Sequence, residues 1–396
     1  MRDEQFRQHV RRWLAENLDP ALRGLGGPGR EHEGFAERLA WNRRLAAAGF
    51  TCLGWPTRYG GAGASPAQQV IFHEEYAQAD APARVSHIGE ELLGPTLLAH
   101  GTAQQCDRFL PRIAAVQDLW CQGYSEPGAG SDLAAVTTRA ELVDDQWVIT
   151  GQKVWTSLAH VADWCFVLAR TSPVGDGPPQ AGLSYLLVPM RQPGVTVRPI
   201  RQLTGTSEFN EVFFDGARTD ADLVVGGIGQ GWRVAMSTLA VERGAATLGQ
   251  QVGFRRELER LIALARARGA ARDPVVRERL TRSWVGLQVL RAHLLASLAA
   301  PSGDPGAGTL PSEIKLLWAA WHRDLGELAV EVIGAPSLVA AGGAGDDLDD
   351  WQRLYLFTRA DTIYGGSDEV QRTVVAERGL GLPRAYGRGR PTGRQG

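Results

Sequence analysis

The order in which two hydrophobic periodicities follow one another limits the fold of this chain most. Before about residue 120, apolar side chains recur at helical spacing, as Phe6, Val10 and Leu14 do. After the glycine-rich stretch 226–231 the helical period returns and predicts three long helices, over 232–269, 274–300 and 313–333. Between these regions, Gly, Pro and Asp turns separate short β-like runs, at 146–151, 164–169, 183–189, 195–200 and 211–215.

This order predicts a multidomain α+β chain. A chain of 396 residues normally divides into about two or three domains. We expect an N-terminal α-helical domain over 1–120, a middle β domain over 121–230 and a C-terminal helical domain over 231–384. Residues 385–396 are rich in Gly and Arg, a composition typical of a disordered tail.

The charge balance argues against nucleic acid and anionic membranes as partners. The formal net charge is -2 at pH 7, so the chain has no broad basic field. No run approaches the roughly 20 apolar residues that a membrane helix needs, and residues 1–18 lack the apolar core of a signal peptide.

The cysteines indicate the compartment rather than a metal site. They lie far apart, without the spacing of metal ligands, so we expect no metal, buried free thiols and a cytoplasmic location. They are Cys52, Cys106, Cys121 and Cys165.

A glycine-rich segment, SEPGAGSD, occupies residues 125–132 at the start of the β region. Glycines permit backbone conformations that a side chain forbids, so main-chain N–H groups and hydroxyls can approach a planar ligand. The structural alternative is an ordinary turn between a helix and a strand.

Two later segments carry groups that suit the same kind of ligand. Residues 151–157, GQKVWTS, supply the Trp155 ring and two hydroxyls, which match a ligand with a π face and polar ring atoms. Alternatively, Trp155 is a core aromatic residue of the β domain. Residues 359–372, RADTIYGGSDEVQR, contain a Gly-Gly pair, for which a glycine hinge with a helix cap is the alternative.

In this order the three segments resemble the signatures of the acyl-CoA dehydrogenases, over about residues 3–384. The resemblance implies an N-terminal α-helical domain, a middle β-barrel-like domain, a C-terminal four-helix bundle and an FAD cofactor. It also implies that 151–157 form a β hairpin. By the same resemblance, ten residues would line the flavin: Gln122, Tyr124, Ser125, Gly130, Ser131, Trp155, Thr156, Ser157, Ser367 and Glu369.

One position departs from the best-known members of that family. Their catalytic glutamate occupies the first glycine slot of the last segment, which is Gly365 here. By the resemblance, the Gly365 N–H could still donate a hydrogen bond to the thioester carbonyl of a substrate. A glycine side chain, however, cannot act as the base.

The resemblance offers a second position for the base. In a minority of the family a glutamate before an arginine, on the first helix of the C-terminal bundle, takes this role, and Glu242 and Arg243 match it. Small or apolar helical neighbours such as Leu239 and Gly249 favour a raised carboxyl pKa. Glu242 is therefore the candidate base, with Arg243 and Ser131 facing the substrate. The alternative is that Glu242 is a solvated helix residue.

The implied reaction is α,β-dehydrogenation of an acyl thioester. A carboxylate removes the α proton, the β hydrogen leaves as hydride to flavin N5, and a 2-enoyl thioester results. The resemblance implies CoA as the carrier, an electron-transfer flavoprotein or similar acceptor, and a homodimer, a homotetramer or a heteromer with a paralogue. Three alternatives stay open: a carrier-protein-bound or biosynthetic substrate, oxygen-using flavin chemistry, and a non-catalytic subunit of a heteromeric dehydrogenase.

Overall fold

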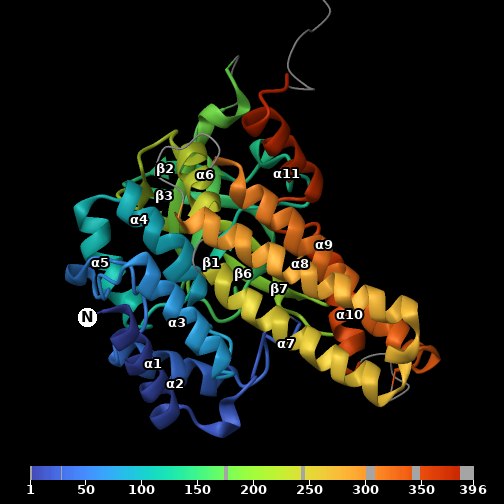
Figure 1. Cartoon of the computed structure of the whole chain (residues 1–396). Helices are drawn as coiled ribbons and strands as arrows, with labels where there is room; N and C mark the ends of the chain where they lie inside the picture. The colour runs from blue at the N-terminus through green and yellow to red at the C-terminus, as the bar shows by residue number, and fades with distance from the viewer. Residues whose placement is uncertain are drawn as a thin grey trace, which may run out of the picture.

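The computed structural model describes residues 2–27, 29–173, 177–241, 246–299, 308–340 and 348–383. Within them the predicted order of helices, sheet and helices is confirmed, and Figure 1 shows the sheet lying between the two helical parts. The expected tail over 385–396 lies outside the described residues.

The N-terminal part is helical because its apolar residues lie on single helix faces. Phe6, Val10 and Leu14 are spaced by four residues and are the buried residues of the first helix. The Thr102 hydroxyl and the Gln105 side chain form a capping box at the start of α5. The helices of this part are α1 (Asp3–Asn17), α2 (Phe35–Ala47), α3 (Pro66–Gln78), the π-helix η3 (Ile88–Leu93), α4 (Gly94–His100) and α5 (Ala103–Ala114).

The middle part is a mixed sheet with the strand order β6-β7-β3-β2-β4-β5-β8, in which β1 pairs in parallel with β4. Its described strands are β1 (Trp120–Gly123), β2 (Arg139–Val143), β3 (Gln146–Ser157), β4 (Trp164–Arg170), β5 (Leu183–Pro189), β6 (Val195–Ile200), β7 (Phe209–Asp220) and β8 (Val224–Val225). The sequence pattern predicted neither β1, β2 nor β8, which are short and have too few residues to show an alternation.

The expectation that residues 151–157 form a β hairpin is wrong. These residues form the second half of the single strand β3. The hairpin joins β2 to β3 and turns at Asp144 and Asp145, whose φ values of 48° and 59° are those of a tight hairpin turn.

The C-terminal part contains α6 (Gly231–Val241), α7 (Ala246–Ala267), α8 (Pro274–Ala299), α9 (Leu310–Ile333), α10 (Asp350–Asp361) and α11 (Asp368–Val374). The long helix predicted over 232–269 corresponds to α6 and α7, and residues 242–245 between them are outside the described ranges. Helices α7 to α10 pack together, as Figure 1 shows at its lower right, around buried side chains that include Phe254, Leu287 and Leu328.

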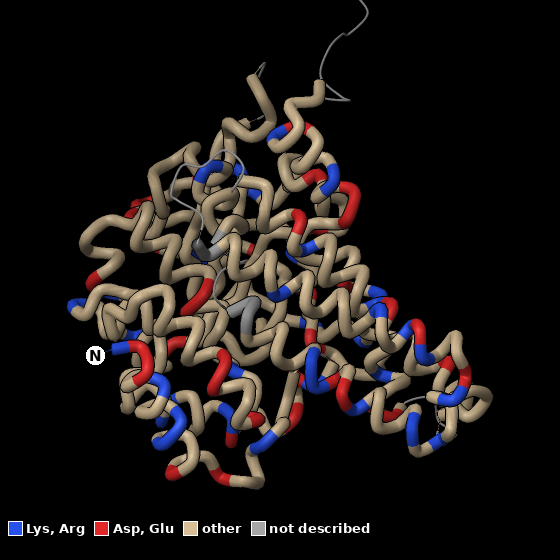
Figure 2. The backbone as a smooth tube through the Cα atoms, viewed as in Figure 1, with Lys and Arg blue, Asp and Glu red and all other residues tan. Residues whose placement is uncertain are grey.

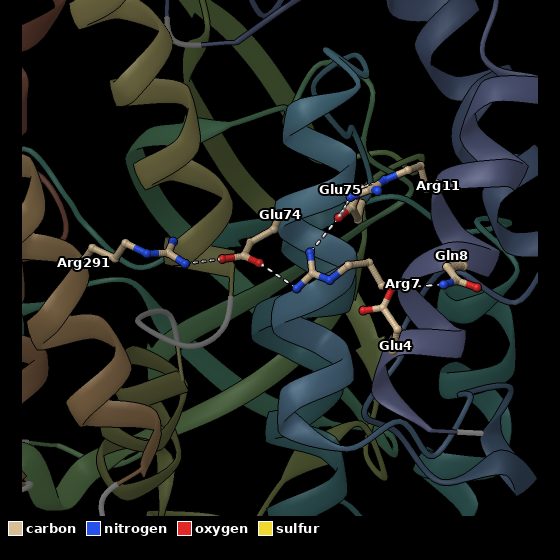
Figure 3. A network of polar contacts seen from close by, with 7 residues as sticks. All are labelled: Glu4, Arg7, Gln8, Arg11, Glu74, Glu75 and Arg291. Carbon is tan, nitrogen blue, oxygen red and sulfur yellow. Dashed lines mark hydrogen bonds and ion pairs between the residues drawn. The ribbon is translucent and has the colours of Figure 1, made fainter.

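A charged network ties the two helical parts to each other (Figure 3). The Glu74 carboxylate on α3 accepts a hydrogen bond from Arg7 of α1 at 3.2 Å and another from Arg291 of α8 at 2.7 Å. Glu75 pairs with Arg7 and Arg11. The network fixes α8 of the C-terminal part against the N-terminal helices.

Elsewhere, residues of both charge signs are interspersed along the same helices (Figure 2). All four cysteines are buried and free, as predicted. Within the described ranges, no helix has both the length and the apolar character to cross a membrane.

Candidate functional site

The first glycine-rich loop is fastened to an irregularity in β3. The register between β3 and β7 shifts between Lys153 and Thr156, so the pairing of these two strands is interrupted at residues 154 and 155. The Val154 N–H instead donates to the Ser125 carbonyl at 2.9 Å. The Lys153 ammonium donates to the Tyr124 carbonyl at 3.0 Å. Two successive residues of β3 thus fix two successive residues of the loop.

A buried ion pair completes this attachment. The Lys153 ammonium lies 2.8 Å from a carboxylate oxygen of Glu126, and the two side chains are 0% and 4% exposed. Glu126 also accepts hydrogen bonds from the backbone N–H groups of Thr137 and Thr138, at 2.7 and 2.9 Å. Lys153 further donates to the Leu168 carbonyl at 2.8 Å. This pair was not predicted from the sequence, although a lysine within a strand of alternating burial is a signal for it.

The surroundings of Glu126 keep it ionised. Burial alone would raise its pKa, but the charge of Lys153 and the hydrogen bond from its ammonium outweigh burial and lower the pKa to about 2. The Glu126 carboxylate therefore keeps its charge in neutral solution, whereas burial lowers the pKa of the Lys153 ammonium opposite it.

Trp155 has an unusual backbone conformation and an exposed side chain. Its φ of 61° is in the left-handed region, which non-glycine residues rarely adopt. The residue is 57% exposed, and its ring makes an edge-to-face contact with the Phe209 ring, with centroids 6.1 Å apart. The alternative that Trp155 is a core residue is wrong. A strained backbone that presents an aromatic ring outward is typical of a binding site.

The next residue, Thr156, is completely buried, yet its hydroxyl has no hydrogen-bond partner among the described residues. The same holds for the side-chain oxygen of Asn210, whose amide nitrogen donates to the Thr156 carbonyl at 3.0 Å. Asn210 also lines a pocket of about 530 Å³ together with His160 and Arg191. Buried polar atoms are normally satisfied, so a polar ligand is the natural partner here. Asn210 was not predicted from the sequence.

The remaining residues predicted around the first loop differ in exposure. Gln122 on β1 and Ser125 and Ser157 are half-buried, while Gly130 and Ser131 are exposed. The Tyr124 ring is buried against Phe166 and Tyr185 in the core, so a ligand contact from Tyr124 could come only from its backbone.

The C-terminal motif forms a turn between α10 and α11. Gly365 and Gly366 have φ values of 63° and 85°, which suit glycine. The Gln371 side-chain amide donates to both of their carbonyls, at 3.0 and 3.3 Å. The Gly365 N–H has no acceptor among the described residues. The two carbonyls of the turn are thus bound by Gln371, and the Gly365 N–H can donate to a ligand.

The two other residues predicted from this motif begin α11. The Ser367 hydroxyl caps the helix by accepting a hydrogen bond from the Val370 N–H at 3.4 Å. Glu369 is exposed, and hydrogen bonds from its own backbone and from Ser367 lower its pKa.

Behind this turn lies a cluster that the sequence pattern did not predict and in which His322 and Asp361 are buried. The Tyr364 hydroxyl donates to Asp361 at 2.6 Å, and the other Asp361 oxygen lies 2.6 Å from His322 Nδ1. His322 Nε2 lies 2.9 Å from Glu257. Burial would lower the pKa of His322, but the charges and hydrogen bonds of Glu257 and Asp361 raise it to about 9.

The structure does not test the predicted base. Glu242 and Arg243 lie outside the described residues. Helix α6, which leads to them, is fixed against α4 by a buried contact between the hydroxyls of Thr96 and Thr238 at 2.9 Å. Among the described residues, no hydrogen bond or ion pair joins loop 125–132 to turn 363–367.

The residues present fit a flavin. The ring system of a flavin has a π face and polar edge atoms, which match the exposed Trp155 ring and the buried, unpartnered Thr156 hydroxyl. The fit rests on middle-domain residues.

Comparison with known proteins covers nearly the whole chain. Residues 2–117, 121–217 and 229–380 match the sequence profiles of the acyl-CoA dehydrogenase N-terminal, middle and C-terminal domains. The chain is 65% identical over 385 residues to acyl-CoA dehydrogenase IpdE1 of Mycobacterium tuberculosis, covering 96% of this chain and 98% of that protein. It is 60% identical over 394 residues to the IpdE1 of Mycolicibacterium smegmatis, with the same coverage.

Solved structures agree with the sequence relatives. The steroid acyl-CoA dehydrogenase Tcur3481-Tcur3483 superimposes with a TM-score of 0.82 at 30% identity, over 97% of this chain and 98% of that chain. The ChsE4-ChsE5 complex of Mycobacterium tuberculosis gives a TM-score of 0.77 at 29% identity, over 97% and 98%. The chain therefore belongs to the acyl-CoA dehydrogenase family.

Proposed function

We propose that this chain is an FAD-dependent dehydrogenase that converts an acyl-CoA thioester into its 2-enoyl thioester. The observation that carries the proposal is the segment Trp155–Thr156–Ser157, with a strained, exposed ring beside a buried hydroxyl that has no partner among the described residues. Family membership supplies the reaction, because acyl-CoA dehydrogenases use a flavin to oxidise acyl thioesters.

The groups that would hold the cofactor come from both glycine-containing segments. When bound, FAD supplies the acceptor for the hydride that leaves the β carbon. The backbone of Gln122, Tyr124 and Gly130, the hydroxyls of Ser125, Ser131, Thr156 and Ser157, the Trp155 ring and the residues Ser367 and Glu369 form the proposed binding set. The buried Lys153–Glu126 pair keeps the first loop in place.

Two tasks remain for the protein at the thioester. One is to stabilise the negative charge that develops on the carbonyl oxygen, and the available Gly365 N–H is a suitable donor. The other is to remove the α proton, which we assign to Glu242, with Arg243 and Ser131 facing the substrate. Gly365 has no side chain for this second task.

We further propose an acyl group of steroid type. The support is the similarity to the steroid acyl-CoA dehydrogenase Tcur3481-Tcur3483, at 30% identity over nearly the whole chain. An electron-transfer flavoprotein is the proposed acceptor. The cytoplasm is the proposed location, because the four buried thiols are free and such thiols are typical of a reducing compartment.

Assembly with a second chain of the same family, a further copy or a paralogue, is also proposed. Helix α8 buries Leu287, Leu290 and Leu294 in the bundle. It also has apolar side chains that are 41–59% exposed in the single chain, namely Val275, Trp284, Val285, Val289 and Leu295. Several exposed apolar side chains on one long helix are typical of a protein interface. Native mass spectrometry of the purified chain, alone and co-expressed with a paralogue, tests this.

Turnover tests the reaction. The purified protein should be yellow and should reduce a dye acceptor with one or more thioesters from a panel of straight-chain, branched and steroid-side-chain acyl-CoAs, each giving an enoyl product. Oxygen uptake with a hydroxylated product, or activity only with carrier-protein thioesters, would contradict this assignment.

Substitution of Glu242 tests the base. Glu242→Gln should retain FAD and lower kcat by about 100-fold or more, because general-base catalysis typically contributes that much. Glu259→Gln is the matched control, since Glu259 is an exposed glutamate on the neighbouring α7. Normal turnover by Glu242→Gln with full flavin would place the base elsewhere. If Ser125→Ala and Trp155→Ala both retained flavin normally, the cofactor site would be misplaced.

A further inference from the structure

Four side chains form a continuous path from the bundle to the turn that contains Gly365, and the two in its middle are buried. Glu257 on α7 contacts His322 on α9, His322 contacts Asp361 at the end of α10, and Asp361 contacts Tyr364. His322 is 1% exposed and Asp361 is 0% exposed. Each link is 2.6 to 2.9 Å long, so the path contains no gap.

The path is a costly way to hold helices together. Apolar residues of similar size would pack the interior of a bundle at least as well, because burying charges incurs a large desolvation penalty. The Phe254 ring lies only 4.4 Å from the His322 ring, centroid to centroid, so apolar surroundings are already present. An ionic path with a buried centre that ends at this turn therefore indicates a role beyond packing.

Tyr364 directly precedes Gly365, and the turn has two opposing attachments. On the α10 side, Asp361 anchors the Tyr364 hydroxyl at 2.6 Å. On the α11 side, Gln371 holds the carbonyls of Gly365 and Gly366. Two successive glycines have little conformational preference of their own, so these attachments must fix the direction of the Gly365 N–H.

We propose that His322 is a positioning residue that acts through Asp361 and Tyr364 to fix the direction of the Gly365 N–H. This inference rests on the function proposed above, in which that N–H meets the thioester carbonyl. A donor to a developing oxyanion is effective only within a narrow range of distance and angle. Small motions of the turn would therefore lower kcat more than they weaken substrate binding.

The path also has a defined response to pH. Among the described residues, the titratable groups that face His322 are Glu257 from α7 and Asp361 from α10. A protonated imidazole donates to both carboxylates at once, whereas a neutral imidazole donates to only one. Loss of the proton therefore breaks one link and loosens the turn in alkaline solution.

Hydrogen exchange of the full-length protein tests the positioning without any need for activity. In His322→Gln and Tyr364→Phe, the amides of residues 362–368 should exchange about five- to tenfold faster than in the wild type, the effect of losing one hydrogen bond. Tyr355→Phe is the control, because Tyr355 is on the adjacent α10 and its hydroxyl makes no hydrogen bond among the described residues. Tyr364→Phe removes one oxygen and covers the case in which His322→Gln fails to fold. Unchanged exchange in Tyr364→Phe would overturn the proposal.

Kinetics separate this inference from the proposed function. With the panel thioester that the wild type oxidises fastest, both variants should lower kcat about tenfold with KM changed less than threefold. Wild-type kcat should fall above about pH 9, and His322→Gln should lack that alkaline limb. Faster exchange with unchanged kcat and an unchanged pH profile would overturn the catalytic part. A wild type that oxidises no thioester would instead refute the proposed function, while the exchange result would still decide whether His322 orders the turn.

Discussion

The two glycine-containing segments of the site are each supported by a buried ionised cluster, and the clusters differ in kind. Under the loop at 125–132, Lys153 pairs with Glu126, and backbone groups satisfy both partners. Behind the turn at 363–367, His322 lies between Asp361 and Glu257. The first cluster joins strands β3 and β4 to one loop, whereas the second joins three helices to a turn.

The difference lies in which groups can change charge. The pKa of Glu126 is lowered to about 2, so its carboxylate keeps its charge throughout the neutral range. The pKa of His322 is raised to about 9, which moderately alkaline solution can reach. The carboxylate that holds the proposed flavin loop thus stays charged in neutral solution, while the imidazole behind the turn for the thioester carbonyl loses its proton in moderately alkaline solution. Burial lowers the pKa of the Lys153 ammonium opposite that carboxylate.

The largest expected effect on stability comes from breaking the buried Lys153–Glu126 pair. Lys153→Met leaves the Glu126 carboxylate buried without a cation, and losing one partner of a buried pair costs about 3–5 kcal/mol of the free energy of unfolding. Urea denaturation measures this cost. The double variant Lys153→Met/Glu126→Gln should recover part of it, because the unpaired charge is then absent.

An exposed ion pair of the same domain is the control for this substitution. Arg139 and Glu141 on β2 are 3.8 Å apart, with side chains 66% and 70% exposed. Arg139→Met should cost less than about 1 kcal/mol. If Lys153→Met cost as little unfolding free energy as Arg139→Met, burial would not make the Lys153–Glu126 pair more important to stability than an exposed pair.

The charge of His322 should make the free energy of unfolding depend on pH in alkaline solution. A raised pKa means that His322 contributes its full stabilisation below its ordinary value of 6.5 and loses it as pH rises through about 9. A shift of this size corresponds to about 3 kcal/mol. The difference in unfolding free energy between the wild type and His322→Gln should therefore be largest near pH 6 and should shrink by pH 9.5. A difference that stays constant over this range would mean that His322 is not charged in the folded protein.

The Glu126 carboxylate should make the free energy of unfolding depend on pH in acid solution instead. Its carboxylate has a lowered pKa, so it contributes fully above its ordinary value of 4.5 and loses its contribution only as pH falls through about 2. The difference in unfolding free energy between the wild type and Glu126→Gln should therefore shrink as pH falls below 4.5. A difference that shrinks in acid for Glu126→Gln and in alkali for His322→Gln would establish the contrast.

The sequence predicted well whatever depends on local periodicity or on contiguous motifs. Helix α1 and strands β4, β5 and β6 follow from the spacing of apolar residues alone. The resemblance located the segments around Ser125, Trp155 and Gly365. The assignments of Glu242, Arg243 and the flavin-lining residues stay predictions, as do the domain boundaries at 120 and 230.

The clusters could not be predicted, because their members are distant in sequence and are brought together only by the fold. Lys153 and Glu126 are 27 positions apart, and His322 is 39 positions from Asp361. The bulge at Trp155 also depends on the pairing of β3 with β7, which no single-strand pattern reveals.

The smallest expected effect concerns a third charged cluster, which links α8 to α3 and lies outside the site. The Arg291 side chain is 37% exposed, and its partner Glu74 keeps a second cation, Arg7, at 3.2 Å when Arg291 is removed. Arg291→Ala should therefore cost only about 1 kcal/mol in urea denaturation and leave kcat and flavin content unchanged. Arg256→Ala is the matched control, because Arg256 makes a similar half-exposed contact between α7 and Asp80. If Arg291→Ala destabilised the protein as much as Lys153→Met, the number of residues that a cluster joins would matter more than the burial and charge state of its members.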